Sequence, residues 1–209
     1  MTSTASGSWS RHITFTVRQD VLYITRDISA VVYPASRISI TRSREEALRE
    51  AVQDRIIDRV PSAAYYETSK IAPFRYDTSR ATIAAALYPF TTGEPRTNAV
   101  YVLECLQNKT QAGTALRQGV SSASIKRYQS AGDARRVLYV GVAQNVLDRI
   151  DQHLNYPGRE GANFTALYPP VRILQVGWFT GKRTAEDAER LTATLLRNRF
   201  PDDFVAYPG

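Results

Sequence analysis

The chain has 209 residues, 43% of them hydrophobic, which is enough for one large domain or two small ones. Its formal net charge of +7 favours polyanionic partners but does not by itself establish a nucleic-acid role. The single cysteine, Cys105, excludes an intramolecular disulfide, and no apolar run is long enough to cross a bilayer. The first residues lack the apolar segment of a signal peptide. These features predict an intracellular, cytoplasmic protein that does not bind membranes.

The N-terminal region has the pattern of a small α+β unit. Residues 12–17 and 21–25 are rich in β-branched and aromatic side chains and predict two paired strands, with a third strand at residues 30–33. Ser43 and Glu46 form a capping-box pattern in front of apolar residues at helical spacing. Nothing in this region indicates a catalytic site.

Residues 61–95 predict an irregular connector, because tyrosine, alanine and proline dominate there. Its aromatic and basic side chains either pack against the rest of the chain or contact nucleic acid. Turn-forming residues at 91–97 then mark a domain boundary. The boundary separates an N-terminal accessory region, residues 1–95, from a second domain, residues 96–209.

The second domain predicts strands at residues 99–105, 137–140 and 171–179. Helices are expected at residues 145–155 and 185–199, the second of them capped by Thr184 and Asp187. The expected fold class is therefore α+β, with a small three-stranded sheet, mixed or antiparallel, that is flanked by helices. The N-terminal region adds an α+β extension.

The segment at residues 136–153 combines a short strand, a glycine and a helix that carries an arginine and a histidine. Gly141 permits a tight turn, and Asn145 is a suitable helix cap. Arg149 and His153 are four residues apart, so they share one face of the helix. Arginine offers a planar set of donors for phosphate oxygens, while histidine can carry a proton near neutral pH. This pattern indicates a phosphate site, and an exposed salt-bridging helix is the alternative.

These residues resemble the motifs of the GIY-YIG nuclease family. Its two name motifs correspond to Ala-Val-Tyr at residues 99–101 and Tyr-Val-Gly at residues 139–141. Arg149 and His153 fall at the family's arginine and at its frequent histidine one helical turn later. The likeness covers about residues 98–203. It implies a metal-dependent DNA endonuclease of restriction, homing or mobile-element type.

The resemblance also implies roles for individual residues in hydrolysis of a phosphodiester bond. Tyr101 and Tyr139 would organise or deprotonate water, Arg149 would stabilise the developing charge, and His153 would relay the proton. The implied cofactor is Mg²⁺ or Mn²⁺. DNA is the implied partner, and a homodimer would be natural for cutting both strands.

The last helix departs from the family pattern at the metal ligand. Thr192 stands where the family has a metal-binding glutamate, and a neutral hydroxyl is a poor substitute for a carboxylate. Glu189, one turn earlier, could hold the metal, or it could be a solvent-edge residue beside Arg190. If the metal carboxylate is lost, the alternative function is that of a catalytically degenerate GIY-YIG-like domain acting as a nucleic-acid-binding or structural assembly module.

A second departure is a basic insertion at residues 106–136, where compact members of the family have a short hairpin. Its glycine, serine and glutamine content predicts a mobile arm, and basic side chains near a phosphate site suggest a DNA clamp. A solvated loop is the alternative. The candidate nucleic-acid-binding residues are Lys109, Arg117, Lys126, Arg127, Arg135 and Arg136.

Overall fold

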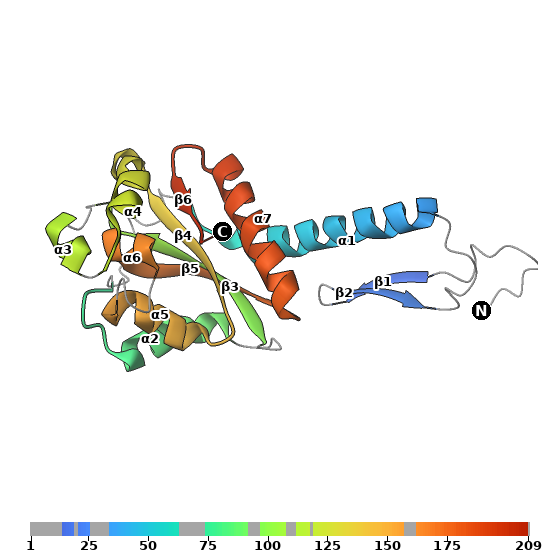
Figure 1. The fold of residues 1–209 in the computed structure, drawn as a ribbon. Coiled ribbons are helices and arrows are strands. Elements are labelled where there is room, and N and C mark those ends of the chain that lie inside the picture. Colours follow the sequence, from blue (N-terminus) through green and yellow to red (C-terminus); the bar gives the residue numbers. More distant parts are fainter. Residues whose placement is uncertain are drawn as a thin grey trace, which may run out of the picture. The chain divides into compact units, whose positions relative to one another are not determined.

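Figure 1 shows the computed structural model of the chain, an α+β protein with a four-stranded mixed sheet flanked by helices. The structure describes residues 14–18, 21–25, 34–62, 74–91, 97–107, 112–117, 119–156 and 162–208. Contacts between residues divide the chain into two compact units, Met1–Ala51 and Val52–Gly209. This division lies earlier in the chain than the boundary expected near residue 95. Within the described ranges, none of the helices has the length and apolar character needed to cross a membrane.

The first unit contains a β-hairpin and most of a long helix. β1 (Thr14–Arg18) and β2 (Val21–Thr25) pair antiparallel, as the sequence predicts. α1 (Pro34–Arg55) begins well before the predicted cap at Ser43. Proline suits the first turn of a helix because its fixed φ is helical and its missing amide would have no partner there. The third strand, predicted at residues 30–33, lies outside the described residues.

The second unit is built on a sheet with the strand order β5-β3-β4-β6. β3 (Asn98–Cys105) lies between β4 (Val137–Ala143) and β5 (Pro170–Phe179) and is antiparallel to both. β6 (Phe204–Ala206) pairs with β4 in parallel. The sequence predicts β3, β4 and β5 at these places. The prediction of a three-stranded sheet is wrong because it lacks β6. A strand of 3 residues is too short to show an alternating pattern.

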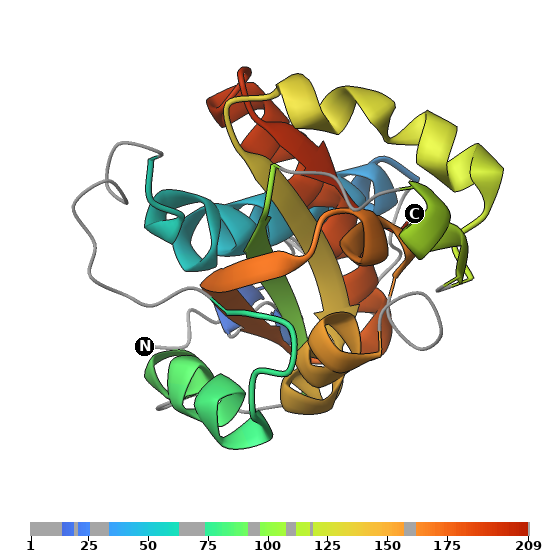
Figure 2. The same ribbon diagram turned by 90° about the vertical axis from the view of Figure 1, so that its left-hand side faces the viewer.

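Helices cover both faces of this sheet. α7 (Lys182–Arg199) lies against one face, and α5 (Val146–Asn155) and α6 (Asn163–Leu167) lie against the other (Figure 1, Figure 2). β3 is therefore buried along nearly its whole length, as expected for a strand with two covered faces. Tyr101 and Leu103 of β3 belong to a core cluster that includes residues of α5 and α6.

α7 begins earlier than the sequence predicts. The helix begins at Lys182, directly after Gly181, and the predicted cap at Thr184 lies inside its first turn. Gly181 has a φ of 86°, a conformation that residues with a Cβ rarely adopt. The glycine thus allows the chain to leave β5 and enter α7 without a side-chain cap, and α7 then packs on β3 and β4.

The connector before β3 contains a helix that the sequence analysis does not predict. Ser79 caps α2 (Arg80–Leu87) by accepting a hydrogen bond of 3.2 Å from the Thr82 amide. Two short 3₁₀ segments are also present, η2 (Ile57–Arg59) before the connector and η4 (Tyr88–Phe90) directly after α2. Ile83 and Leu87 of α2 join the core, so this part of the connector is an integral part of the second unit.

The described part of the basic insertion is also helical. It forms α3 (Ala112–Arg117), α4 (Ser122–Arg127) and the 3₁₀ segment η5 (Gln129–Asp133). Ala115 and Ala131 are fully buried in the core cluster. The prediction of a mobile arm is wrong for these residues, because small apolar side chains anchor them to the domain.

Candidate functional site

A pocket of about 490 Å³ lies at the edge of β4, where four elements and the chain's last residues meet. It is lined by Tyr101, Tyr139, Val142, Arg149, Glu186, Glu189, Arg190 and Pro208. The pairing of β4 with β6 ends at Tyr139, so the Val142 end of β4 is bordered by α7. The pocket thus brings together Tyr101, Tyr139, Arg149 and Glu189, four of the five residues that the sequence analysis assigns to catalysis and metal binding. The fifth, His153, does not line it.

Gly141 does not form the predicted turn, because it lies inside β4 opposite Tyr101 of β3. A Cβ built on Gly141 would lie 2.5 Å from Cζ and 2.8 Å from Cε2 of Tyr101, closer than carbon atoms can approach. The Tyr101 ring therefore lies across the glycine, and any larger residue at this position would displace it. The glycine of the motif serves the site by leaving room for the tyrosine.

Tyr101 and Tyr139 are buried at 0% and 1% exposure, with ring centroids 6.4 Å apart. Burial raises the pKa of both phenols, and the nearby Arg149 only partly offsets this effect. Both hydroxyl groups therefore remain protonated near pH 7. The hydroxyl of Tyr139 has no hydrogen-bond partner among the described residues, so it is free to contact a ligand. Such hydroxyls are suited to positioning an oxygen atom and poorly suited to removing a proton from water without help.

Arg149 reaches the pocket from the first turns of α5. The predicted cap is confirmed, since the Asn145 side chain accepts a hydrogen bond of 3.2 Å from the Asp148 amide. The guanidinium of Arg149 donates to Gln152 Oε1 at 2.9 Å and hydrogen-bonds the Tyr101 side chain. Arg149 is half-buried, and a fixed guanidinium beside two phenols provides a positive wall for an anion.

His153 lies one turn further along α5 and is only 1% exposed. Its Nε2 is 2.9 Å from Tyr101 Oη, so Arg149 and His153 both contact Tyr101, as their shared helix face predicts. Burial and the charge of Arg149 lower the pKa of His153 to about 3. The imidazole is therefore neutral near pH 7, and this environment does not favour the expected exchange of protons at neutral pH.

Glu189 enters the pocket from the opposite face, on α7, and is 7% exposed. Burial and then the charge of Glu186 raise its pKa to about 7, while the Val142 amide, Arg190 and Arg149 lower it. Glu189 Oε1 has no hydrogen-bond partner among the described residues. The alternative of a solvent-edge glutamate is wrong, because the side chain is buried.

Thr192, which the sequence analysis aligns with a metal-binding glutamate, does not line this pocket. It is 0% exposed and lies deeper in the protein, whereas Glu189 one turn earlier is the carboxylate that the helix presents. Glu186 and Arg190 also line the pocket, although the sequence analysis assigns them no role. Glu186 lies three residues before Glu189 and four before Arg190, so helical spacing could have revealed both, since residues three and four apart share a helix face.

The carboxylates of the pocket fit a divalent cation. Mg²⁺ is held by one or two protein carboxylates, water and substrate oxygens. Glu189 supplies a buried oxygen without a partner, and Glu186 lies beside it. Among the described residues, no group of three or more His, Cys, Asp and Glu side chains is placed to hold a metal. Glu189, with Glu186, would therefore be the protein's contribution to a Mg²⁺ or Mn²⁺ site.

The basic insertion lies away from this pocket. It connects Cys105 to Val137, which pair at one end of the β3–β4 hairpin, whereas Val142 lies near the other end. At 3.3 Å per residue, Tyr101 is about 13 Å along β3 from Cys105. The exposed candidates are Arg117, Lys126, Arg127 and Arg135, and Lys109 lies outside the described residues. These side chains can reach DNA only at some distance from the pocket.

Arg136 is a buried structural residue, which corrects its assignment to nucleic-acid binding. Its side chain is 3% exposed, and Nε and Nη2 donate to Asp203 Oδ2 at 2.8 and 2.6 Å. The remaining Nη1 donates to the Pro61 carbonyl at 2.7 Å. With its charge neutralised inside the protein, Arg136 cannot contact a phosphate backbone.

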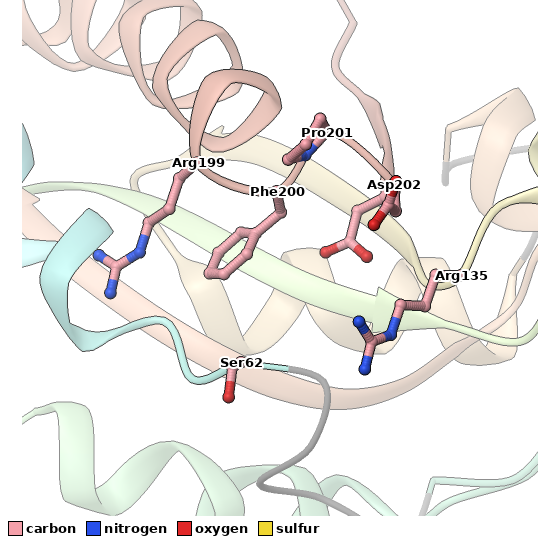
Figure 3. A pocket seen from close by; sticks show the side chains of 7 residues that line it. Ser62, Arg135, Arg199, Phe200, Pro201 and Asp202 are labelled. Atoms are coloured by element: carbon pink, nitrogen blue, oxygen red, sulfur yellow. The ribbon is translucent and has the colours of Figure 1, made fainter.

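Arg135 borders a second pocket, of about 270 Å³, which Figure 3 shows. Its lining consists of Ser62, Arg135, Arg199, Phe200, Pro201, Asp202 and Asp203. Arg199 donates to Asp58 Oδ1 at 3.2 Å, and Asp203 is paired with Arg136. Glu189 and Arg199 are about 15 Å apart along α7, so the two pockets are separate. Acidic and basic groups balance here, and the pocket has no marked preference for an anion.

Comparisons with known proteins found no matching family model, curated protein or solved structure. The chemistry of the site is therefore argued from the tyrosine-lined pocket. A guanidinium, two protonated phenols and a buried carboxylate can together hold a phosphate group and a cation.

Proposed function

We propose that the chain is a metal-dependent endonuclease that hydrolyses phosphodiester bonds in DNA, with a catalytic pocket of the GIY-YIG kind. The observation that carries the proposal is the meeting of Tyr101, Tyr139, Arg149 and Glu189 in one pocket. These residues come from β3, β4, α5 and α7, and they include the two tyrosines and the arginine that resemble the family motifs.

Arg149 provides the positive charge that hydrolysis of a phosphate diester requires. Charge builds up on the phosphoryl oxygens during the reaction, and a fixed guanidinium in a partly dry site stabilises it more than water does. The guanidinium is held by Gln152 and by the Tyr101 side chain, so it needs little rearrangement when the substrate binds. Arg149 would therefore contact a non-bridging oxygen of the scissile phosphate.

Tyr101 and Tyr139 would orient the attacking water and the phosphate. Because burial keeps both phenols protonated, each can donate a hydrogen bond to an oxygen atom. The unpartnered hydroxyl of Tyr139 is available for this purpose without breaking a contact in the protein. Correct placement of the reacting atoms is the main contribution that such groups make to hydrolysis.

Glu189, assisted by Glu186, would hold the divalent cation. When bound, Mg²⁺ or Mn²⁺ supplies a Lewis acid that polarises the phosphoryl oxygens and lowers the pKa of water. Without a cation, burial and Glu186 disfavour the charge on Glu189. A cation would reverse this preference, since it stabilises the ionised carboxylate.

The charge distribution supports DNA as the substrate. The net charge is +7, and the basic side chains of the insertion are exposed on α3, α4 and the turn before β4. They would contact phosphates that flank the cleaved bond, and every neutralised phosphate makes binding more sensitive to salt.

A second candidate function is a DNA-binding module that does not cleave. Thr192 favours it, because a neutral residue stands where the family has its metal-binding glutamate. In that case Glu189 would be a buried carboxylate without a catalytic role. The two candidates share the prediction of DNA binding and differ only in hydrolysis.

The test is cleavage of supercoiled and branched DNA by the purified protein in Mg²⁺ and in Mn²⁺. Arg149→Ala and Glu189→Ala should both lose cleavage, whereas Arg75→Ala, which removes an exposed arginine outside the pocket, should retain it. Salt-sensitive DNA binding without cleavage by any of the four proteins would favour the binding module. Cleavage that survives both pocket substitutions would place the active site elsewhere.

A further inference from the structure

The contacts behind His153 determine which of its two ring nitrogens carries the proton. Nε2 faces Tyr101 Oη at 2.9 Å, and Nδ1 faces away from the pocket toward the start of α6. Two groups reach Nδ1, the Ala162 backbone amide at 3.3 Å and Thr165 Oγ1 at 2.9 Å. In a neutral imidazole one nitrogen donates and the other accepts, so these contacts decide the tautomer.

The Ala162 amide requires Nδ1 to be an acceptor. A backbone N–H can only donate, and it would oppose a hydrogen on Nδ1 directly. The Thr165 hydroxyl has one hydrogen, and it suits this assignment by donating that hydrogen to Nδ1 rather than to the Ala162 carbonyl, which also lies 2.9 Å from Oγ1. The cationic form of His153 would also carry a hydrogen on Nδ1. The surroundings therefore select the neutral ring with its hydrogen on Nε2.

This tautomer fixes the direction of the hydrogen bond to Tyr101. The Nε2–H group donates to Tyr101 Oη, and the oxygen also accepts from Arg149. His153 then has no free lone pair with which to take the proton of Tyr101. The hydroxyl hydrogen of Tyr101 must point to a third partner, and the remaining open side of this residue is the pocket that it lines.

We infer that the Ala162 amide and the Thr165 hydroxyl are positioning groups that hold His153 as a donor and thereby make Tyr101 a hydrogen-bond donor toward the pocket. The inference rests on the proposed function for the identity of the acceptor, an oxygen of the scissile phosphate or of the attacking water. Tyr101 then orients that oxygen and does not act as a base supported by His153. His153 is likewise a positioning residue.

The first test measures the tautomer by NMR on protein labelled with ¹⁵N at histidine. The chain has 2 histidines, and His153→Gln identifies which signals belong to residue 153. The expected result is a ring protonated only at Nε2, unchanged between about pH 5 and 8, where an ordinary histidine titrates. A ring protonated at Nδ1, or one that titrates in this range, would overturn the inference.

The second test asks whether Thr165 affects the reaction through His153. Thr165→Val keeps the shape of the side chain and removes the hydroxyl, while Thr165→Ser retains it. We expect Thr165→Val to lower the rate of single-turnover cleavage about tenfold, as the loss of roughly one hydrogen bond would, and to disturb the ¹⁵N signals of His153. Thr165→Ser should restore both. An unchanged rate together with altered His153 signals would contradict the positioning role.

A matched control is Thr91→Val, since Thr91 Oγ1 also lies 2.9 Å from a carbonyl oxygen three residues earlier, that of Tyr88. It should leave both the rate and the His153 signals unchanged. The two tests also separate this inference from the proposed function. If no protein cleaves DNA while Nε2 carries the proton, the nuclease proposal fails and the assignment of Tyr101 as a donor toward the pocket is supported.

Discussion

Replacing Glu189 with glutamine should stabilise the protein at high pH, because burial of the carboxylate outweighs its favourable contacts with the Val142 amide and nearby arginines. Its pKa is raised from 4.5 to about 7 in the folded protein, with burial as the largest cause. The folded state therefore holds the proton more tightly than the unfolded state does. The contribution of Glu189 to stability is fully present below about pH 4.5 and is lost as the pH rises through about 7.

The size of the effect follows from the same two values. A rise from 4.5 to about 7 corresponds to about 3 kcal/mol at roughly 1.36 kcal/mol for each pKa unit. Glu189→Gln keeps the shape and cannot ionise. Relative to the wild type, its free energy of unfolding should be similar near about pH 4.5 and up to about 3 kcal/mol higher above about pH 8.

The assay is urea unfolding in metal-free buffer across this pH range, with Glu50→Gln as a control at an exposed glutamate. The control should show no comparable change with pH. Mg²⁺ added at high pH should stabilise the wild type by mass action and leave Glu189→Gln unaffected. A variant that is less stable than the wild type above about pH 8 without metal would refute the reasoning, since it would mean that the ionised carboxylate is well paired.

Three further substitutions test individual parts of the structure. Tyr139→Phe removes a hydroxyl that has no hydrogen-bond partner among the described residues. Unfolding in urea should show no loss of stability, while cleavage should fall at least about tenfold. A decrease of more than about 1 kcal/mol in the free energy of unfolding would reveal a missed hydrogen bond. Arg136→Ala leaves Asp203 buried and unpaired, so the free energy of unfolding should fall by about 3–5 kcal/mol, and a fall below about 1 kcal/mol would contradict the buried pair. Gly141→Ala should displace the Tyr101 ring and reduce cleavage about 100-fold, with DNA binding retained. A wild-type rate of cleavage would show that the ring can move without loss of activity.

The parts of the fold that the sequence predicts are those with a strong local pattern. β3, β4, β5, α5 and α7 carry apolar residues at strand or helix spacing over several residues, and Asn145 caps α5 as expected. β6 is too short for such a pattern. The helices of the basic insertion are also short, and their stability depends on contacts with distant residues such as those around Ala115.

The site shows the same difference between local and long-range information. The i, i+4 spacing of Arg149 and His153 places both beside Tyr101, which is a local property of a helix. Burial is set by the tertiary fold, and the sequence alone does not show that Arg136 is paired with Asp203 inside the protein. The role of Gly141 was also missed, because it depends on the ring of a residue on the neighbouring strand.

The measurement that tests the central claim most directly is single-turnover hydrolysis of a labelled DNA duplex, with binding recorded on the same sample. With enzyme in excess, the proposal predicts product formation in Mg²⁺, none in EDTA, and none from Arg149→Ala at equal occupancy of the DNA. Complete binding without product in Mg²⁺ or Mn²⁺, on linear, supercoiled and branched DNA alike, would contradict it.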